Sequence, residues 1–191
     1  MFIRRHLAVL PGLIAAAVIC LAPAASARDT CRHAKTPATA ATRSQMRAAV
    51  VCLINQQRTR RHLPALHPRR TLDRSAQRWT NTMVASGRFT HGASFTARIT
   101  AAGFNWTAAG ENIATGFATP HDVVTAWMAS TGHCRNILDP TFADVGTGVS
   151  RHRVGERPAA PATWTQDFGL PSGHTPPSSN HRPMNGCPYR I

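Results

Sequence analysis

The chain has 191 residues and carries 22 lysines and arginines against 8 acidic residues, a formal net charge of +14. This length allows one domain with a proper hydrophobic core. Beyond the N-terminal segment, no stretch is apolar enough to cross a bilayer, which predicts no transmembrane segment in the mature chain.

The N-terminal segment has the features of a secretory signal peptide. Arg4 and Arg5 precede an apolar run over residues 7–21, and the small residues of 24–27 (AASA) follow it. The run is shorter than the ~20 residues that a membrane span needs. We therefore expect residues 1–27 to be removed, which leaves a secreted, extracellular protein. The arginine- and alanine-rich composition suggests a bacterial source.

The mature chain remains strongly basic. Losing Arg4 and Arg5 lowers the net charge only from +14 to +12, and Lys35 is the only lysine. A basic secreted protein is attracted to anionic cell-wall polymers, acidic lipid or nucleic acid. The arginines are scattered along the sequence, which favours a compositional bias over a dedicated site. No motif predicts sequence-specific nucleic-acid binding.

Four cysteines lie beyond the signal peptide: Cys31, Cys52, Cys134 and Cys187. An even number in an oxidising compartment predicts two disulfides, for which three pairings exist. Cys31–Cys52 and Cys134–Cys187 are favoured, because the first would fix the arm before the first helix and the second would fix the C-terminal tail. A four-cysteine zinc site is the alternative, although no C-x-x-C spacing supports it.

The first half of the mature chain predicts helices. Residues 28–43 are polar without periodicity and predict an N-terminal arm, whereas apolar residues at helical spacing predict an amphipathic helix over residues 44–61. A second helix is expected between Thr71 as N-cap and Gly87 as stop. A third helix begins at Thr119, an N-cap that is followed directly by proline.

The second half predicts strands. Asp144–Ser150 and Ala162–Phe168 have strand character, and the residues between them predict a loop or widened hairpin. Residues 171–191 hold five prolines and predict an irregular C-terminal tail. Because helices come early and strands late, we expect an α/β fold with helices packed on a small sheet.

Three polar residues are candidates for chemistry. His91 follows the second helix, Glu111 lies in a short segment flanked by apolar residues, and His133 follows the third helix. Two imidazoles and a carboxylate can bind a divalent metal or exchange protons. Their spacing alone predicts neither, and hydrogen-bonded loop residues are the default interpretation.

Seven short motifs occur in the order and spacing of a known family: Leu53-Ile54-Asn55-x-x-Arg58, Phe89-Thr90-His91, Gly110-Glu111-Asn112-Ile113-Ala114, Val124-x-x-Trp127-Met128-x-Ser130-x-Gly132-His133, Asn136-Ile137-Leu138, Val145-Gly146-x-Gly148 and Trp164-Thr165-Gln166-Asp167-Phe168-Gly169. Through these motifs, residues 48–169 resemble the CAP superfamily of cysteine-rich secretory, antigen 5 and pathogenesis-related proteins, in its bacterial SCP-like extracellular branch. The resemblance implies a single CAP-type α-β-α sandwich, which we place at residues 44–170.

The resemblance also implies a cleft lined by two histidines and two acidic residues. His91, Glu111 and His133 match three of these positions, while Ser130 replaces the glutamate of animal and plant members. Three ligands remain, which suffices for Zn²⁺ with water or leaves a structural hydrogen-bond cluster. Asn112 is expected to cap a turn beside Glu111.

Other motif residues are expected to be structural. Asn55 and Arg58 would fix the first helix to a loop, and Trp127 and Trp164 would belong to the core.

Three functions follow as hypotheses, because fold alone does not define activity. The first is a non-catalytic, monomeric extracellular binding module for a lipid, a cell-envelope polymer or a protein, with a cleft able to bind metal. The second is a metal-dependent, peptidase-like hydrolase in which His91 and His133 hold the metal and Glu111 is a ligand or general base. The third is an electrostatic binder of anionic envelope polymers.

Overall fold

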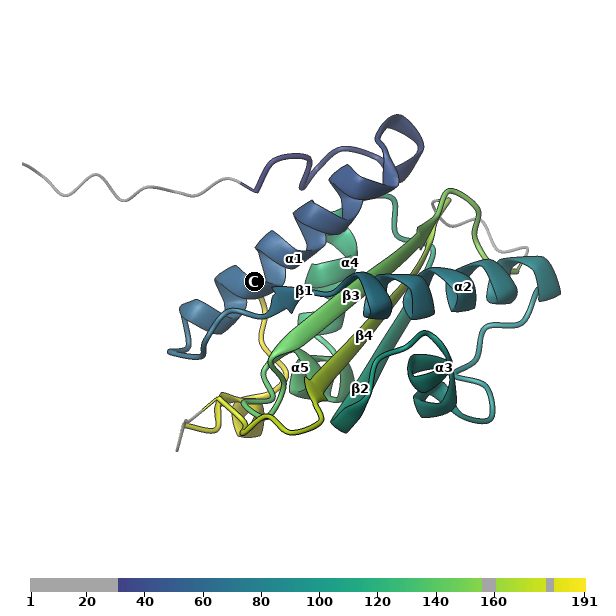
Figure 1. Ribbon diagram of the computed structural model, residues 1–191. Helices are drawn as coiled ribbons and strands as arrows, with labels where there is room; N and C mark the ends of the chain where they lie inside the picture. The colour runs from purple at the N-terminus through teal and green to yellow at the C-terminus, as the bar shows by residue number, and fades with distance from the viewer. Residues whose placement is uncertain (1–30, 156–160, 178–180) are drawn as a thin grey trace, which may run out of the picture.

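Figure 1 shows a computed structural model of the chain, which describes residues 31–155, 161–177 and 181–191. The expected signal peptide lies outside the described residues. Within the described part of the chain, no helix has the length and apolar character needed to cross a membrane.

A four-stranded sheet forms the middle layer. Its strand order is β1 (His67–Pro68), β3 (Asp144–Ser150), β4 (Thr163–Pro171), β2 (Trp106–Thr115). β1 pairs parallel with β3, whereas β4 pairs antiparallel with both β3 and β2. β2 is therefore an edge strand, and most of β3 extends beyond its two-residue neighbour β1.

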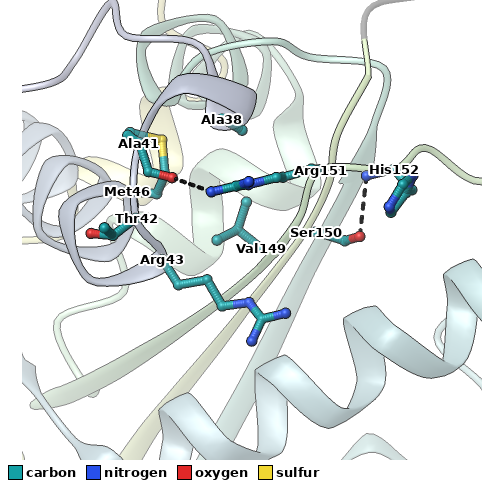
Figure 2. A pocket seen from close by; sticks show the side chains of 9 residues that line it. All are labelled: Ala38, Ala41, Thr42, Arg43, Met46, Val149, Ser150, Arg151 and His152. Carbon is teal, nitrogen blue, oxygen red and sulfur yellow. Dashed lines mark hydrogen bonds between the residues drawn. The ribbon is translucent and has the colours of Figure 1, made fainter.

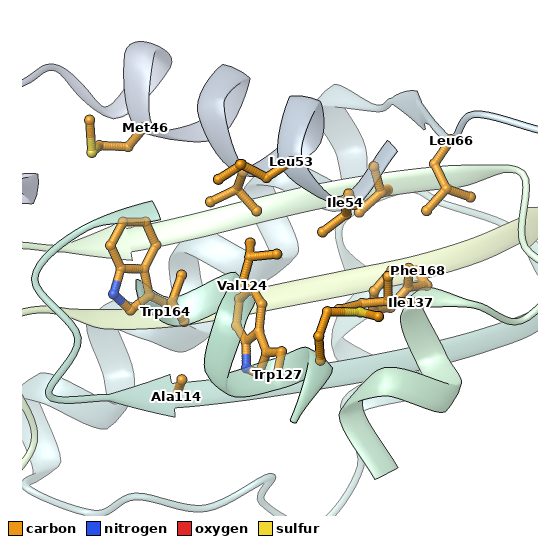
Figure 3. Packing of buried hydrophobic residues seen from close by; sticks show 14 of the residues in the cluster. Met46, Leu53, Ile54, Leu66, Ala114, Val124, Trp127, Ile137, Trp164 and Phe168 are labelled. Atoms are coloured by element: carbon orange, nitrogen blue, oxygen red, sulfur yellow. The ribbon is translucent and has the colours of Figure 1, made fainter. Parts of the chain in front are cut away.

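One face of the sheet is covered by α1 (Arg43–Thr59), α4 (Pro120–Met128) and α5 (Thr131–Ile137). The main core lies on this side, where Trp127 and Trp164 are buried as expected among aliphatic side chains of α1 and α4 (Figure 3).

The other face is covered by α2 (Arg70–Ser86) and α3 (Phe95–Ala101). Gly146 and Gly148 of β3 explain how α2 lies so close, because a Cβ atom at either position would overlap the backbone of α2 at Leu72–Asp73 or at Ala76. The expected α-β-α sandwich is confirmed, with α2 and α3 on one side of the sheet and α1, α4 and α5 on the other (Figure 1).

Most of the predicted helix positions and helix ends agree with the structure. The helix expected over residues 44–61 is α1, and Thr119 is the N-cap of α4, with its hydroxyl accepting from the Asp122 amide at 3.1 Å. Gly87 ends α2 in the left-handed conformation at φ 65°. The predicted N-cap Thr71 is wrong, because α2 begins at Arg70 and its N-cap is Arg69.

Besides the two-residue β1, three α-helices and strands lack a sequence prediction. These are β2, α3 and α5, and two of them carry candidate residues: Glu111 lies within β2, and His133 lies within α5 rather than in a loop after the third helix. Asn112 is likewise part of β2, so the expected turn cap there is wrong.

Arg58 ties the end of α1 to the rest of the fold, and its buried guanidinium donates to the carbonyl oxygens of Pro64, Ile137, Asp139 and Phe142 at 2.8–3.3 Å. Burial lowers the pKa of Arg58 to about 10, while the charge of Asp139 raises it. Asn55 exchanges two hydrogen bonds with the backbone of Leu66. Both residues fix α1 to loops, as their motif suggested.

Two disulfides fasten the chain ends. Cys31 pairs with Cys52 across 5.7 Å between Cα atoms, and Cys134 pairs with Cys187 across 5.8 Å. The first joins the arm, which contains the short helix η1 (Ala38–Ala40), to α1. The second joins the tail, with its helix η2 (Pro183–Gly186), to α5. This is the pairing that the sequence favours.

Side chains close the edge of β3 where β1 ends. Arg47 Nε donates to the Thr147 carbonyl at 2.7 Å, and Asp73 Oδ1 accepts from the Thr147 amide at 2.8 Å. The carboxamide of Gln77 binds both backbone groups of Val149, at 3.1 and 3.0 Å. Each of these outward-facing backbone groups therefore has a partner although no strand pairs there.

Candidate functional site

The loop between α2 and α3 carries His91. It is fixed at Thr90, whose carbonyl accepts from Trp79 Nε1 at 3.0 Å, and at Gly92, which has a φ of +70°. A Cβ atom at Gly92 would lie 2.7 Å from the Trp79 ring, so glycine is required by both conformation and space. The imidazole is consequently held at one place, although 52% of the His91 side chain is exposed.

Glu111 projects from the edge strand β2 beneath this loop. Its side chain is only 1% exposed, and its Oε1 lies 2.8 Å from His91 Nδ1. Because an ionised carboxylate only accepts, Nδ1 carries the proton of this bond. The other ring nitrogen, Nε2, is the atom of His91 that remains for a ligand.

Arg98 of α3 completes the group. Its guanidinium stacks on Trp79 at 3.8 Å and donates to the His91 carbonyl at 2.9 Å and to Glu111 Oε2 at 2.5 Å. Charge-assisted bonds of this kind are stronger than neutral ones. Arg98 therefore holds both His91 and Glu111 in place.

His133 approaches from the other face of the sheet. Asn112, the next residue of β2 after Glu111, donates to the His133 carbonyl at 3.2 Å, and Asn136 joins the Asn112 side chain to the Glu111 carbonyl at 2.9 and 3.1 Å. Burial lowers the pKa of His133 below its usual 6.5, and the nearby charge of His91 lowers it further. Both histidines are tied to neighbouring residues of β2, His91 to Glu111 and His133 to Asn112.

Asp167 lies behind this group, directly opposite Glu111 in the β2–β4 ladder. Burial raises the pKa of Asp167 well above its usual 3.8 and the charge of Glu111 adds to this, while Ser75 and Arg98 oppose it. The Asp167 carboxyl therefore keeps its proton to a higher pH than an ordinary aspartate.

The three predicted site residues gather at one edge of the sheet, although only His91 and Glu111 touch through their side chains. Ser130 is the N-cap residue of α5, and its side chain makes no capping hydrogen bond. Sequence reasoning missed Arg98, Asp167 and the supporting role of Trp79. Ser94, whose hydroxyl accepts from the Ala97 amide at 3.1 Å, is an N-cap signal from which α3, and hence Arg98, could have been predicted.

Of the two alternatives, the arrangement fits a hydrogen-bond cluster better than a Zn²⁺ site. No three His, Cys, Asp or Glu side chains in the described part of the chain converge as metal ligands. Both oxygens of Glu111 are engaged, one by His91 and the other by the permanent cation of Arg98. A divalent ion at Glu111 would have to displace or approach that positive charge.

Comparison with known proteins identifies the family. Residues 51–168 match the CAP, cysteine-rich secretory protein family. The chain belongs to this family. A relative from Bacillus subtilis, the uncharacterized protein YkwD, is 36% identical over 124 residues, a match that covers 62% of this chain and 45% of the relative. The chain thus spans less than half the length of that relative.

Solved structures of CAP-type domains share the fold. An extracellular protein containing an SCP domain from Bacillus anthracis matches 68% of this chain and 44% of its own length, with a TM-score of 0.56 at 24% identity. An outer surface protein of Borrelia burgdorferi matches 64% of this chain and 90% of its own length, with a TM-score of 0.57 at 19% identity. A cysteine-rich secretory protein of Staphylococcus aureus covers 66% and 39%, with a TM-score of 0.56 at 16% identity.

Proposed function

We propose that this chain is a secreted, monomeric and non-catalytic CAP module that binds an amphipathic cell-envelope ligand at the edge of β2. The observation that carries the proposal is the half-exposed His91 ring, oriented by buried Glu111 at 2.8 Å, two residues beyond the exposed Phe89. The pattern of a signal peptide, the two disulfides, and relatives described as extracellular or outer surface proteins support secretion.

His91 and Phe89, two residues apart in the same loop, would offer a polar and an apolar contact to a ligand. His91 presents Nε2 outward because Nδ1 is bound to Glu111. Phe89 is 48% exposed, whereas the aromatic side chains of the core are buried. Exposed aromatic side chains beside oriented polar groups are typical of ligand sites. A lipid-like molecule would place its head group at the histidines and its apolar part on Phe89.

A fluorescent long-chain fatty acid is a suitable first probe, with the mature, oxidised protein. We expect Phe89→Ser and His91→Asn each to weaken binding by about tenfold, since each removes one half of the contact. Ile191→Ser is the matched control, because Ile191 is the other exposed large hydrophobic residue of the described chain and lies in the tail. Equal weakening by Phe89→Ser and Ile191→Ser would overturn the proposed site.

Zinc titration by calorimetry tests the metal interpretation of the same cleft. We expect no tight one-to-one binding, because Arg98 neutralises the only acidic candidate. A His91→Ala/His133→Ala double variant is the control. Tight zinc binding that disappears in this variant would overturn the expectation and restore a metal site.

The hydrolase hypothesis has one observation in its favour. A carboxylate bound to the Nδ1 of a histidine is the arrangement that orients a general base. If the cleft hydrolyses a peptide or envelope polymer, activity on a broad substrate panel should disappear in His91→Ala and His133→Ala while the fold survives. No hydrolysis by the native protein is what the binding function predicts.

A further inference from the structure

Two hollows lie on the side of the molecule opposite the cleft, along the outer edge of β3. The first, of about 390 Å³, lies between the N-terminal arm, the first turn of α1 and the end of β3 (Figure 2). The second, of about 410 Å³, lies between α1 and the exposed side of α2. Arg43 lines the first and Arg47, one turn further along α1, lines the second, so the two hollows adjoin.

Arginines dominate the walls of both hollows. On α2 they recur every fourth residue, at Arg70, Arg74 and Arg78, and all three are exposed. On α1 the same spacing separates Arg43 from Arg47, and Arg151 follows β3. We call these six arginines the basic groove.

The charges of the basic groove are not compensated. Arg74 and Arg151 donate only to backbone carbonyls, those of Ala102 and Ala41, and Figure 2 shows Arg151 reaching to the latter. The side chains of Arg43, Arg70 and Arg78 bind no other described residue.

Asp73 is the one carboxylate among the residues that line the hollows. It accepts from the Thr147 amide at 2.8 Å and lies 3.9 Å from Arg47. The residues that line the two hollows therefore include six guanidinium groups and one carboxylate.

A row of arginines at this spacing lowers the stability of its helix. Like charges four residues apart destabilise a helix, and Asp73, three residues after Arg70, is the one acidic residue of α2 that offsets the row. The carbonyl bonds of Arg74 and Arg151, and that of Arg47 to Thr147, hold guanidinium groups in fixed positions. Guanidinium groups so placed match phosphate oxygens in paired hydrogen bonds.

We propose that the basic groove binds a linear phosphate polymer, whose successive phosphates contact the arginines of α1 and α2. A groove between two helices suits a chain rather than a flat membrane surface. Arg47 and Gln77 of the second hollow already bind backbone groups of Thr147 and Val149 in β3, so recognition falls to the arginine side chains. The inference does not depend on the cleft, because the basic groove lies at the opposite edge of the sheet.

Binding of long-chain inorganic polyphosphate to the mature, oxidised protein at physiological salt tests the proposal. We expect Arg70→Gln/Arg74→Gln/Arg78→Gln to weaken binding by about tenfold or more and to reduce the salt slope by about one per arginine. Arg60→Gln/Arg88→Gln/Arg190→Gln removes the same charge from exposed positions outside the basic groove and should change the affinity by less than about twofold, because screening limits distant charges. Equal weakening by both triple variants would overturn the proposal.

Backbone amide shifts of the native protein provide a readout that does not depend on the folding of any variant. Polyphosphate should shift the amides of α1, α2 and residues 147–152, and shifts centred on His91 would overturn the assignment.

Competition identifies the source of the phosphates. Displacement by a poly(glycerol phosphate) chain and by a single-stranded oligonucleotide alike supports recognition of backbone phosphates. Displacement by orthophosphate at equal phosphate concentration or by phosphatidylglycerol vesicles would overturn a linear phosphate polymer as the ligand. Displacement by the oligonucleotide but not by poly(glycerol phosphate) would overturn recognition through the phosphates, because it would point to the bases.

Discussion

Glu111 of β2 and Asp167 of β4 stand directly opposite each other in an antiparallel pair, so two carboxyl groups share one buried space on the α2–α3 face of the sheet. Glu111 is compensated by Arg98, whereas Asp167 has its pKa raised by burial and by Glu111 itself. The pair stays buried because only one of its members needs to be charged.

Asp167→Asn should change how stability depends on pH. A folded-state pKa above the unfolded value means that the native state binds more protons, so this contribution is complete below the usual 3.8 of Asp and is lost as pH rises through the raised pKa. The native protein should therefore lose stability with rising pH in that window, and Asp167→Asn should not. Urea unfolding over a pH series measures both, and a variant weakened by the same amount at every pH would contradict the prediction.

His133 should titrate below the usual 6.5 of histidine in an NMR titration of ring protons, chiefly because of burial. His91→Asn should raise the pKa of His133 only part of the way, since burial remains. Because the unfolded chain takes up this proton first, stability should fall as pH drops from about 6.5 through the lower folded pKa. A His133 pKa unchanged by His91→Asn would contradict an electrostatic effect of His91 on His133.

Arg98→Met should release the His91 loop. The substitution keeps apolar contact with Trp79 but leaves buried Glu111 with His91 alone, and losing one member of such a pair costs about 3–5 kcal/mol. We expect lower stability together with faster amide exchange in residues 88–94. Arg88→Met, at an exposed position of the same loop, is the control and should leave both measurements close to native.

Gly148→Ala should destabilise the protein by about 1–3 kcal/mol, because the added methyl group would overlap the backbone of α2 at Ala76. Gly132→Ala is the matched control. Gly132 lies in α5 with no atom within 4 Å of the added methyl group, so alanine there should stabilise by about 0.5–1 kcal/mol. Thermal unfolding compares the two, and similar effects at both positions would contradict the close approach of α2 to β3.

The sequence predicted elements whose signals are local. Thr119 and Gly87 marked helix ends through capping chemistry that depends on neighbouring residues alone. The strand β2 was not predicted, because its alanines and Gly110 lack the branched side chains typical of strands. Gly110 is small because Phe142 packs against it.

The candidate site was predictable as a set of residues but not as an arrangement. The motifs identified His91, Glu111 and His133, and nothing in their spacing indicated that Arg98 would occupy the second oxygen of Glu111. That contact depends on how α3 packs beside β2, which is a long-range consequence of the fold. It is also what separates the expected zinc site from the observed hydrogen-bond group.

The side-chain closure of β3 has a consequence for the behaviour of the protein in concentrated solution. An open strand edge is a template on which another molecule can add a strand, and this is a common route to aggregation. Gln77 and Asp73 occupy those positions on β3 with side chains that the same molecule supplies. These two polar residues of α2 therefore act as determinants of colloidal stability, and they keep neighbouring copies of the chain from joining sheet to sheet.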